Sequence, residues 1–299
     1  MPARGSTNVK RRRLSLGVVT VLVIAIVAAL ASAGVFAAEP PRLRLEGEAD
    51  DRPVVFVPGL TSTPDVFGEA ATGHLKAYLA GFAGEPPAAP ASPYVVPAAE
   101  ALAREIEARD LRGVVLVGHS LGGVVSLLAA AEAGDRVTDV LVVDSVPFFP
   151  GLIMPGATPE AMAAQAPMWR ARTAAMDEAT WLATVRTGLD RQATSQADRD
   201  RIYADAERSD LASAKAGYLD LMLTDYRPAL AGLAARVTIL VPHHDAMGLD
   251  ADTLLATYRA QYAGVPNVRL VLVRDSRHFV MLDQLDAFAD ALAEVLAGG

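Results

Sequence analysis

The sequence predicts an α/β fold built on a mostly parallel, doubly wound sheet, and three observations support this prediction. Short runs of valine, isoleucine and leucine alternate with alanine-rich helical patterns over residues 53–297. The apolar runs are nearly continuous, which is typical of strands buried on both faces of a sheet. One interval, 147–233, has no strand pattern, so we expect a helical cap inserted after the strand that ends near Asp144.

The elements follow in a regular order along the chain. Strands are predicted at 53–59, 113–118, 139–144, 236–242 and 267–273, and helices at 98–110, 120–133, 251–263 and 283–297. Residues 74–79 fit either another strand or a helix end. Helical patterns in the cap cover 158–176, 178–189, 196–208 and 209–223. We therefore divide the chain into an N-terminal segment (1–40), a core (41–146 and 234–299) and a cap (147–233).

The N-terminal segment has the pattern of an export signal. Four consecutive basic residues, Lys10 to Arg13, precede an apolar run from Leu14 to Phe36, and small residues at 31–38 offer cleavage sites. The run is also long enough to span a bilayer, so an uncleaved anchor through residues 14–36 is an alternative to a signal peptide. Either interpretation places the remainder of the chain in the periplasm, outside the cell, or anchored to the outer side of the cytoplasmic membrane.

Composition narrows the chemistry and the partners. The chain has no cysteine, which excludes disulfides and thiolate metal sites. After residue 37 it carries 22 basic and 35 acidic residues, a formal charge of −13. Such a charge repels polyanions, so we expect no nucleic-acid partner.

The strongest motif lies between a predicted strand and a predicted helix. Residues 118–122 read Gly-His-Ser-Leu-Gly, a G-x-S-x-G sequence in the strand–turn–helix setting that its chemistry requires. The tight turn presents the hydroxyl of Ser120 above the sheet at a helix N-terminus, where negative charge is favoured. Ser120 could also be a simple helix cap, but Gly123 and the flanking elements favour a nucleophile.

With these residues the chain resembles the α/β-hydrolase superfamily, specifically its capped serine esterases and lipases. The resemblance covers about residues 53–297 and rests on PVVFVPGL, GHSLGG, the helical insertion and SRHFVMLDQ. These motifs are specific for the superfamily but not for one substrate.

The resemblance implies a catalytic base and an acid. Among five histidines, His278 follows the last predicted strand, where the superfamily carries its base. His119 is expected to point away from the site. Asp245 follows the strand at 236–242, the usual position of the acid, and is our choice, with Asp144 as the alternative that some members use.

Further site residues follow from the same resemblance. The N–H groups of Leu121 and Leu60 are expected to form the oxyanion hole, although Pro58-Gly59 replaces the commoner His-Gly. Phe148 and Phe149 leave a strand end and are expected to line an apolar substrate pocket. No cofactor is expected. No metal is expected either, because the adjacent His243 and His244 would point to opposite sides of an extended segment and could not easily bind one ion.

We therefore expect a serine hydrolase that cleaves carboxylic esters through an acyl-enzyme, acting on a small ester with an apolar acyl or aromatic part. Lactonase, C–C hydrolase and cofactor-free haloperoxidase activities use the same triad and remain alternatives. Two interpretations come from other classes: a metal-dependent hydrolase using His243, His244 and Asp245, and a non-catalytic envelope protein that binds an apolar ligand under its cap.

Overall fold

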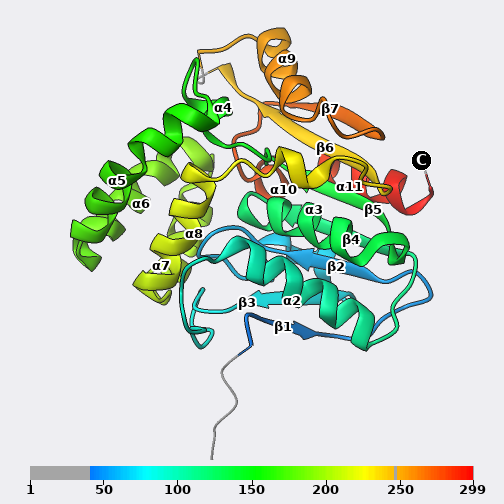
Figure 1. Ribbon diagram of the computed structural model, residues 1–299. Helices are drawn as coiled ribbons and strands as arrows, with labels where there is room; N and C mark the ends of the chain where they lie inside the picture. The colour runs from blue at the N-terminus through cyan, green and yellow to red at the C-terminus, as the bar shows by residue number, and fades with distance from the viewer. Residues whose placement is uncertain (1–40, 246–247, 299) are drawn as a thin grey trace, which may run out of the picture. The chain divides into compact units, whose positions relative to one another are not determined.

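The computed structural model describes residues 41–245 and 248–298, which form a sheet with helices on both of its faces (Figure 1). The described strands lie in the order β1-β3-β2-β4-β5-β6-β7. Only β1 runs antiparallel to its neighbour, and the other pairs are parallel. The strands are β1 (Leu43–Glu46), β2 (Val54–Val57), β3 (Leu75–Leu79), β4 (Val114–His119), β5 (Val137–Val143), β6 (Arg236–His243) and β7 (Val268–Arg274). The predicted fold class is confirmed.

Two strands near one edge of the sheet, β1 and β3, were not predicted outright from the sequence. The ambiguous segment 74–79 is the strand β3. The sequence did not predict β1, because this strand has four residues and turns only Leu43 and Leu45 inward. So short an alternation carries little signal.

The core lies on both faces of the sheet, because successive residues of a strand point to opposite sides. In β2, Val55 and Val57 join one apolar cluster, while Val54 and Phe56 join the other. The helices that flank the sheet are α2 (Val95–Ala108), α3 (Leu121–Ala133), α9 (Ala251–Gln261), α10 (Val280–Asp283) and α11 (Leu285–Leu296), with the short 3-10 helices η1 (Pro64–Ala71) and η2 (Gly134–Arg136).

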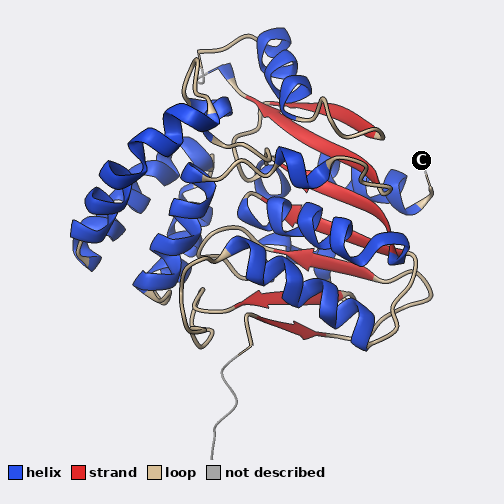
Figure 2. Cartoon of the chain, in the orientation of Figure 1, coloured by secondary structure: helices blue, strands red, loops and turns tan. Residues whose placement is uncertain are grey.

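The segment between β5 and β6 is helical in the structure (Figure 2). It comprises α4 (Pro150–Ile153), α5 (Pro159–Ala175), α6 (Glu178–Gln192), α7 (Gln196–Glu207), α8 (Leu211–Leu223) and the 3-10 helix η3 (Arg227–Leu230). The four longest of these helices begin where the side chain of Thr158, Asp177, Ser195 or Asp210 accepts a hydrogen bond from the backbone three residues later.

Hydrogen bonds join this cap to the core. The carboxylate of Asp220 in α8 accepts from the backbone N–H groups of Tyr94 and Val95, at 2.6 and 3.0 Å. The N–H of Asp210 donates to the carbonyl of Gly81 at 2.7 Å. These bonds fix the cap relative to the loops that follow β3.

Within the described residues, no helix is long and apolar enough to cross a membrane. The predicted leader, including the apolar run 14–36, lies outside them.

Candidate active site

Ser120 occupies a strained turn between β4 and α3. Its backbone has φ 51° and ψ −122°, a conformation that side-chain-bearing residues rarely adopt. Its N–H donates to the carbonyl of Val143 at 3.0 Å, which ties the turn to the end of β5. The turn leaves the side chain partly exposed at the carboxyl end of the sheet.

The glycines around Ser120 are required by close backbone approach. A Cβ atom on Gly118 would lie 2.4 Å from the carbonyl oxygen of Gly122. A Cβ atom on Gly122 would lie 2.2 Å from the carbonyl oxygen of Val57. Both distances are far shorter than a normal contact, so the turn cannot form with larger residues. The G-x-S-x-G sequence therefore has here the structure that a nucleophile elbow requires.

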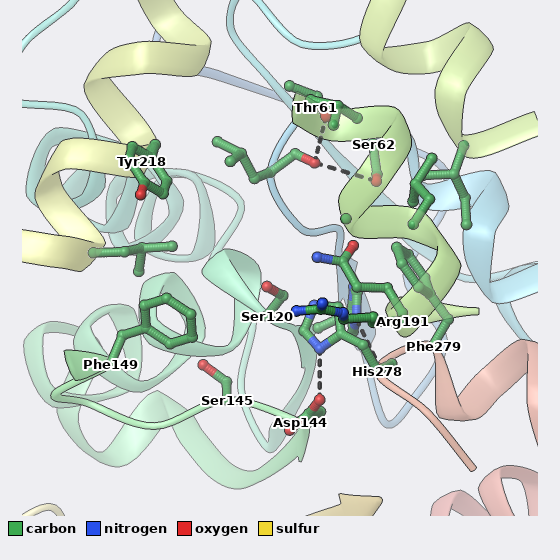
Figure 3. A pocket seen from close by; sticks show the side chains of 18 of the residues that line it. Thr61, Ser62, Ser120, Asp144, Ser145, Phe149, Arg191, Tyr218, His278 and Phe279 are labelled. Carbon is green, nitrogen blue, oxygen red and sulfur yellow. Dashed lines mark hydrogen bonds and ion pairs between the residues drawn. The ribbon is translucent and has the colours of Figure 1, made fainter. Parts of the chain in front are cut away.

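His278 and Asp144 form a hydrogen-bonded pair beside this turn (Figure 3). His278 Nδ1 donates to Asp144 Oδ2 at 2.5 Å. In the sheet, His119 pairs with Val143, so Ser120 and Asp144 each stand one residue past the end of neighbouring strands. Asp144 also leaves its strand with a positive φ of 43°. The parallel arrangement thus brings the hydroxyl of Ser120, the imidazole of His278 and the carboxylate of Asp144 to one edge of the sheet.

The partner of His278 differs from the one that we chose from the sequence. Asp245 is exposed and lies two residues past the end of β6, where its carbonyl accepts from the N–H of Gly248 at 3.1 Å. The carboxylate that meets Nδ1 of His278 is that of Asp144, our alternative. Asp144 and Asp245 follow the neighbouring strands β5 and β6, and it is Asp144, one residue past the end of β5, that contacts the imidazole.

Two tyrosines, one in α9 and one directly after it, hold the end of β5, and neither was identified from the sequence. The hydroxyl of Tyr258 donates to Oδ1 of Asp144, and the hydroxyl of Tyr262 donates to the carbonyl of Ser145 at 2.8 Å. Both rings are buried. Burial, together with the charge of Asp144, raises the pKa of Tyr258 well above its usual value, so this hydroxyl keeps its proton. A buried tyrosine needs a polar partner, but the sequence does not say which.

His119 does not point away from the site as expected. Its ring lies 4.4 Å from that of His278, between centroids, and its Nε2 donates to the backbone carbonyl of His278 at 3.1 Å. Complete burial, and secondarily the neighbouring His278, lowers the pKa of His119 well below its usual value. His119 is therefore a neutral support beneath the loop that carries His278.

The loop after β2 carries Leu60, one of the two predicted oxyanion donors, and the other, Leu121, directly follows Ser120. The carbonyl of Leu60 accepts from the hydroxyl of Thr61 at 2.7 Å and from that of Ser62 at 3.4 Å (Figure 3). Among the described residues, no backbone carbonyl accepts a hydrogen bond from the N–H of Leu60 or from the N–H of Leu121. Both groups thus remain available to a ligand, and Leu121 starts α3, where the helix dipole adds positive character.

A cavity of about 470 Å³ connects these groups to the cap. Ser120, Asp144 and His278 line it together with mainly apolar side chains, among them Leu60, Phe149, Leu152, Trp181, Val185 and Phe279. Its size suits a small organic substrate. Of the two predicted pocket residues, Phe149 lines the cavity, whereas Phe148 packs with Met162 and Met222 inside the cap.

The site contains no hydrogen bond between the hydroxyl of Ser120 and His278. Such catalytic hydrogen bonds are often long before a substrate binds. In the described ranges, 41–245 and 248–298, no cluster of three His, Asp or Glu side chains could hold a metal ion. His243, one of the three ligands considered for a metal, uses Nε2 to donate to the carbonyl of Leu249 at 3.0 Å.

Comparison with known proteins identifies a matching family and solved structures of similar fold. A model of the Alpha/beta hydrolase family matches residues 54–291, well over half of the chain. The chain is similar to a hydrolase from Oleispira antarctica, at 13% identity with a TM-score of 0.67, covering 87% of this chain and 96% of that one.

Two further solved structures share the arrangement. An esterase from Exiguobacterium antarcticum is 16% identical, with a TM-score of 0.65 over 85% of this chain and 95% of that one. An enol-lactonase from Burkholderia xenovorans LB400 is 18% identical, with a TM-score of 0.61 over the same shares. At these identities the similarity to solved structures shows the fold alone.

Proposed function

The chain belongs to the alpha/beta hydrolase family, and from that premise we propose that it is a serine hydrolase that cleaves carboxylic esters. One observation carries the proposal. The hydroxyl of Ser120, on its strained turn, and the hydrogen-bonded pair of His278 and Asp144 line the same apolar cavity. Leu60, in the loop after β2, lines that cavity too, and the second expected donor, Leu121, directly follows Ser120, so each part of an acyl-transfer site is represented.

In the proposed acylation, Oγ of Ser120 attacks the ester carbonyl while Nε2 of His278 takes its proton. The carboxylate of Asp144 holds the imidazole with its proton on Nδ1 and stabilises the imidazolium. The N–H groups of Leu60 and Leu121 stabilise the oxyanion of the tetrahedral intermediate. The intermediate collapses, the bond to the alcohol breaks, and the alcohol leaves with the proton from His278.

Deacylation repeats the sequence with water. His278 removes a proton from a water molecule that attacks the acyl carbonyl, and then returns the proton to Oγ of Ser120 as the acid leaves. A lactone is a cyclic ester and would open through the same steps. The similarity to an enol-lactonase keeps that substrate class within the proposal.

Active-site labelling tests the proposal directly. A fluorophosphonate should label the wild-type protein at Ser120 and should not label Ser120→Ala. Ester turnover, measured with p-nitrophenyl esters of rising acyl length, should fall by about four to six orders of magnitude in Ser120→Ala and His278→Ala. Equal labelling of the wild type and Ser120→Ala would exclude Ser120 as the nucleophile.

The same assay tests the two alternatives from other classes, a metal-dependent hydrolase and a non-catalytic binding protein. Turnover that EDTA abolishes and Zn²⁺ restores would replace the serine mechanism with a metal-dependent one. A protein that binds apolar esters without turnover or labelling would be a binding protein.

A further inference from the structure

Arg191 is held directly beside the loop that carries His278. It lies in the last turn of α6, and its two neighbours in the chain are bonded to the two neighbours of His278. The carbonyl of Asp190 accepts from Arg277 Nη1 at 2.7 Å, and the carbonyl of Gln192 accepts from the N–H of Phe279 at 3.1 Å. The backbone of Arg191 is thus fixed next to the base.

The side chain of Arg191 extends into the cavity (Figure 3). Among the described residues that line this cavity, Arg191 is the only lysine or arginine, and Asp144 is the only carboxylate. The Asp144 carboxylate already accepts from His278 and Tyr258. Arg191 is exposed, so its guanidinium is hydrated in the free protein and accessible to an anionic ligand.

The acidic residues near Arg191 are engaged elsewhere. Asp190 pairs with Arg199 at 3.7 Å. The carboxylate of Asp283 accepts from the N–H groups of Thr194 and Arg277, at 2.9 and 2.8 Å. In the part of the chain that the structure describes, the guanidinium of Arg191 has no carboxylate partner.

The guanidinium of Arg191 offers a positive charge to a ligand in the cavity. A substrate anion bound to the guanidinium would neutralise it and would be held by two parallel N–H donors, the geometry that arginine offers to a carboxylate. Apolar side chains, among them Phe149, Leu152 and Val185, line the cavity as well and would contact the apolar part of the substrate.

We propose that Arg191 binds a carboxylate of the substrate, so that the substrates are esters carrying a second, ionised carboxyl group separated from the scissile bond by a short apolar chain. This inference rests on the proposed serine hydrolase function and names its substrate class.

Two matched esters test it. Mono-p-nitrophenyl glutarate and p-nitrophenyl pentanoate have acyl chains of the same length and differ in the terminal carboxylate. The wild type should prefer the glutarate ester by kcat/KM, and Arg191→Gln should lower the ratio of the two kcat/KM values about 10- to 100-fold. Arg191→Lys, which keeps the charge without the fork, should give an intermediate ratio. The control is Arg170→Gln, on the exposed surface of α5, which should leave the ratio unchanged.

An unchanged ratio in Arg191→Gln overturns the inference. If this variant only lowers the melting temperature, Arg191 stabilises the C-terminus of α6 and does not select substrates.

A binding experiment separates failure of this inference from failure of the proposed function. Calorimetry with Ser120→Ala should detect monophenyl glutarate more tightly than phenyl pentanoate, and adding Arg191→Gln should remove the difference. If the wild type cleaves neither ester but this difference is found, the anion site stands and the hydrolase proposal fails. If both esters are cleaved and bind equally, the hydrolase proposal stands and the anion site fails.

Discussion

The hydroxyl of Tyr258 donates a hydrogen bond to Oδ1 of Asp144, the carboxylate whose Oδ2 accepts from Nδ1 of His278. Each carboxylate oxygen therefore has its own donor, and the plane of the carboxylate is fixed from both sides. Tyr258 is fully buried on α9 and keeps its proton, so this support does not titrate in the physiological range. In the proposed mechanism, the base His278 is oriented by Asp144, and Asp144 in turn is oriented by Tyr258.

We expect Tyr258→Phe to lower kcat for p-nitrophenyl esters by about 10-fold with little change in KM, because one hydrogen bond to a charged group is lost. The acid limb of the kcat pH profile should also shift, because Asp144 would be less firmly held beside the imidazole.

The control for that change is Tyr262→Phe, which removes a hydroxyl from the residue directly after α9. This hydroxyl bonds to the backbone of Ser145 rather than to Asp144. Its loss should affect melting temperature more than kcat. Equal effects of the two changes on kcat and on the pH profile would show that Tyr258 is only structural.

The acid can be identified with two carboxamide substitutions. Asp144→Asn should lower kcat by about 10³- to 10⁴-fold, because the imidazole loses the partner that fixes its tautomer. Asp245→Asn should leave kcat within about threefold, because Asp245 is exposed and Asp144 occupies Nδ1 of His278. Circular dichroism and melting temperature would check that both variants fold. A larger loss in Asp245→Asn would restore Asp245 as the acid.

Sequence periodicity was sufficient for the sheet because its strands are buried on both faces and read as continuous apolar runs. The five strands predicted outright correspond to β2, β4, β5, β6 and β7, within a few residues at their ends. The short edge strand β1 was missed, since two inward leucines do not distinguish a strand from a loop.

The site was predictable where the chemistry resides in local sequence. Ser120 could be located because a tight turn needs glycines at fixed neighbouring positions. The partner of His278 could not, because Asp144 and Asp245 both follow neighbouring strands, and no sequence pattern says which carboxylate reaches Nδ1. Tyr258 contacts Asp144, and the residues that flank Arg191 bond to the loop that carries His278. These contacts join parts of the chain that are more than 80 residues apart, which no local pattern encodes.

The predicted leader can be tested separately from catalysis. Residues 1–40 fused to an alkaline phosphatase that is active only outside the cytoplasm should yield an active reporter, because the basic and apolar pattern is that of an export signal. The control fusion lacks residues 14–36 and should be inactive. An inactive reporter from the complete segment would contradict the prediction. Mass spectrometry of the exported protein would distinguish cleavage from retention as an anchor.

His119 should make the protein less stable in mild acid. Its folded pKa is depressed, so between its unfolded pKa, about 6.5, and the lower folded pKa, only the unfolded chain takes up the proton. Its contribution to the free energy of unfolding is present above pH 6.5 and decreases by up to about 1.4 kcal/mol per pH unit below it. Urea unfolding at pH 7.5, 6.5 and 5.5 should show a smaller decrease in His119→Gln than in the wild type. Parallel curves would contradict this account.

Asp139 should contribute to stability through a buried junction at the opposite end of β5. Its carboxylate accepts from Arg236 Nε at 2.7 Å and from Arg52 Nη2 at 2.9 Å. Arg52 also bonds to the carbonyls of Val295 and Leu296, so the junction links β5 and β6 to the end of α11.

Asp139→Asn should lower the free energy of unfolding at pH 7 by about 1–3 kcal/mol, less than for a fully buried pair because both arginines are partly exposed. Burial alone would raise the pKa of Asp139, but the hydrogen bonds from Arg236 and the charges of both arginines outweigh it and lower the pKa. The stabilisation is therefore present above the unfolded pKa, about 3.9, and is lost as the pH falls through the lower folded pKa.

The free energies of unfolding of the wild type and of Asp139→Asn, measured with denaturant, should converge as the pH falls below about 4. The exposed Asp135→Asn is the control, and a cost for Asp139→Asn that does not change with pH would show that packing, not charge, is responsible.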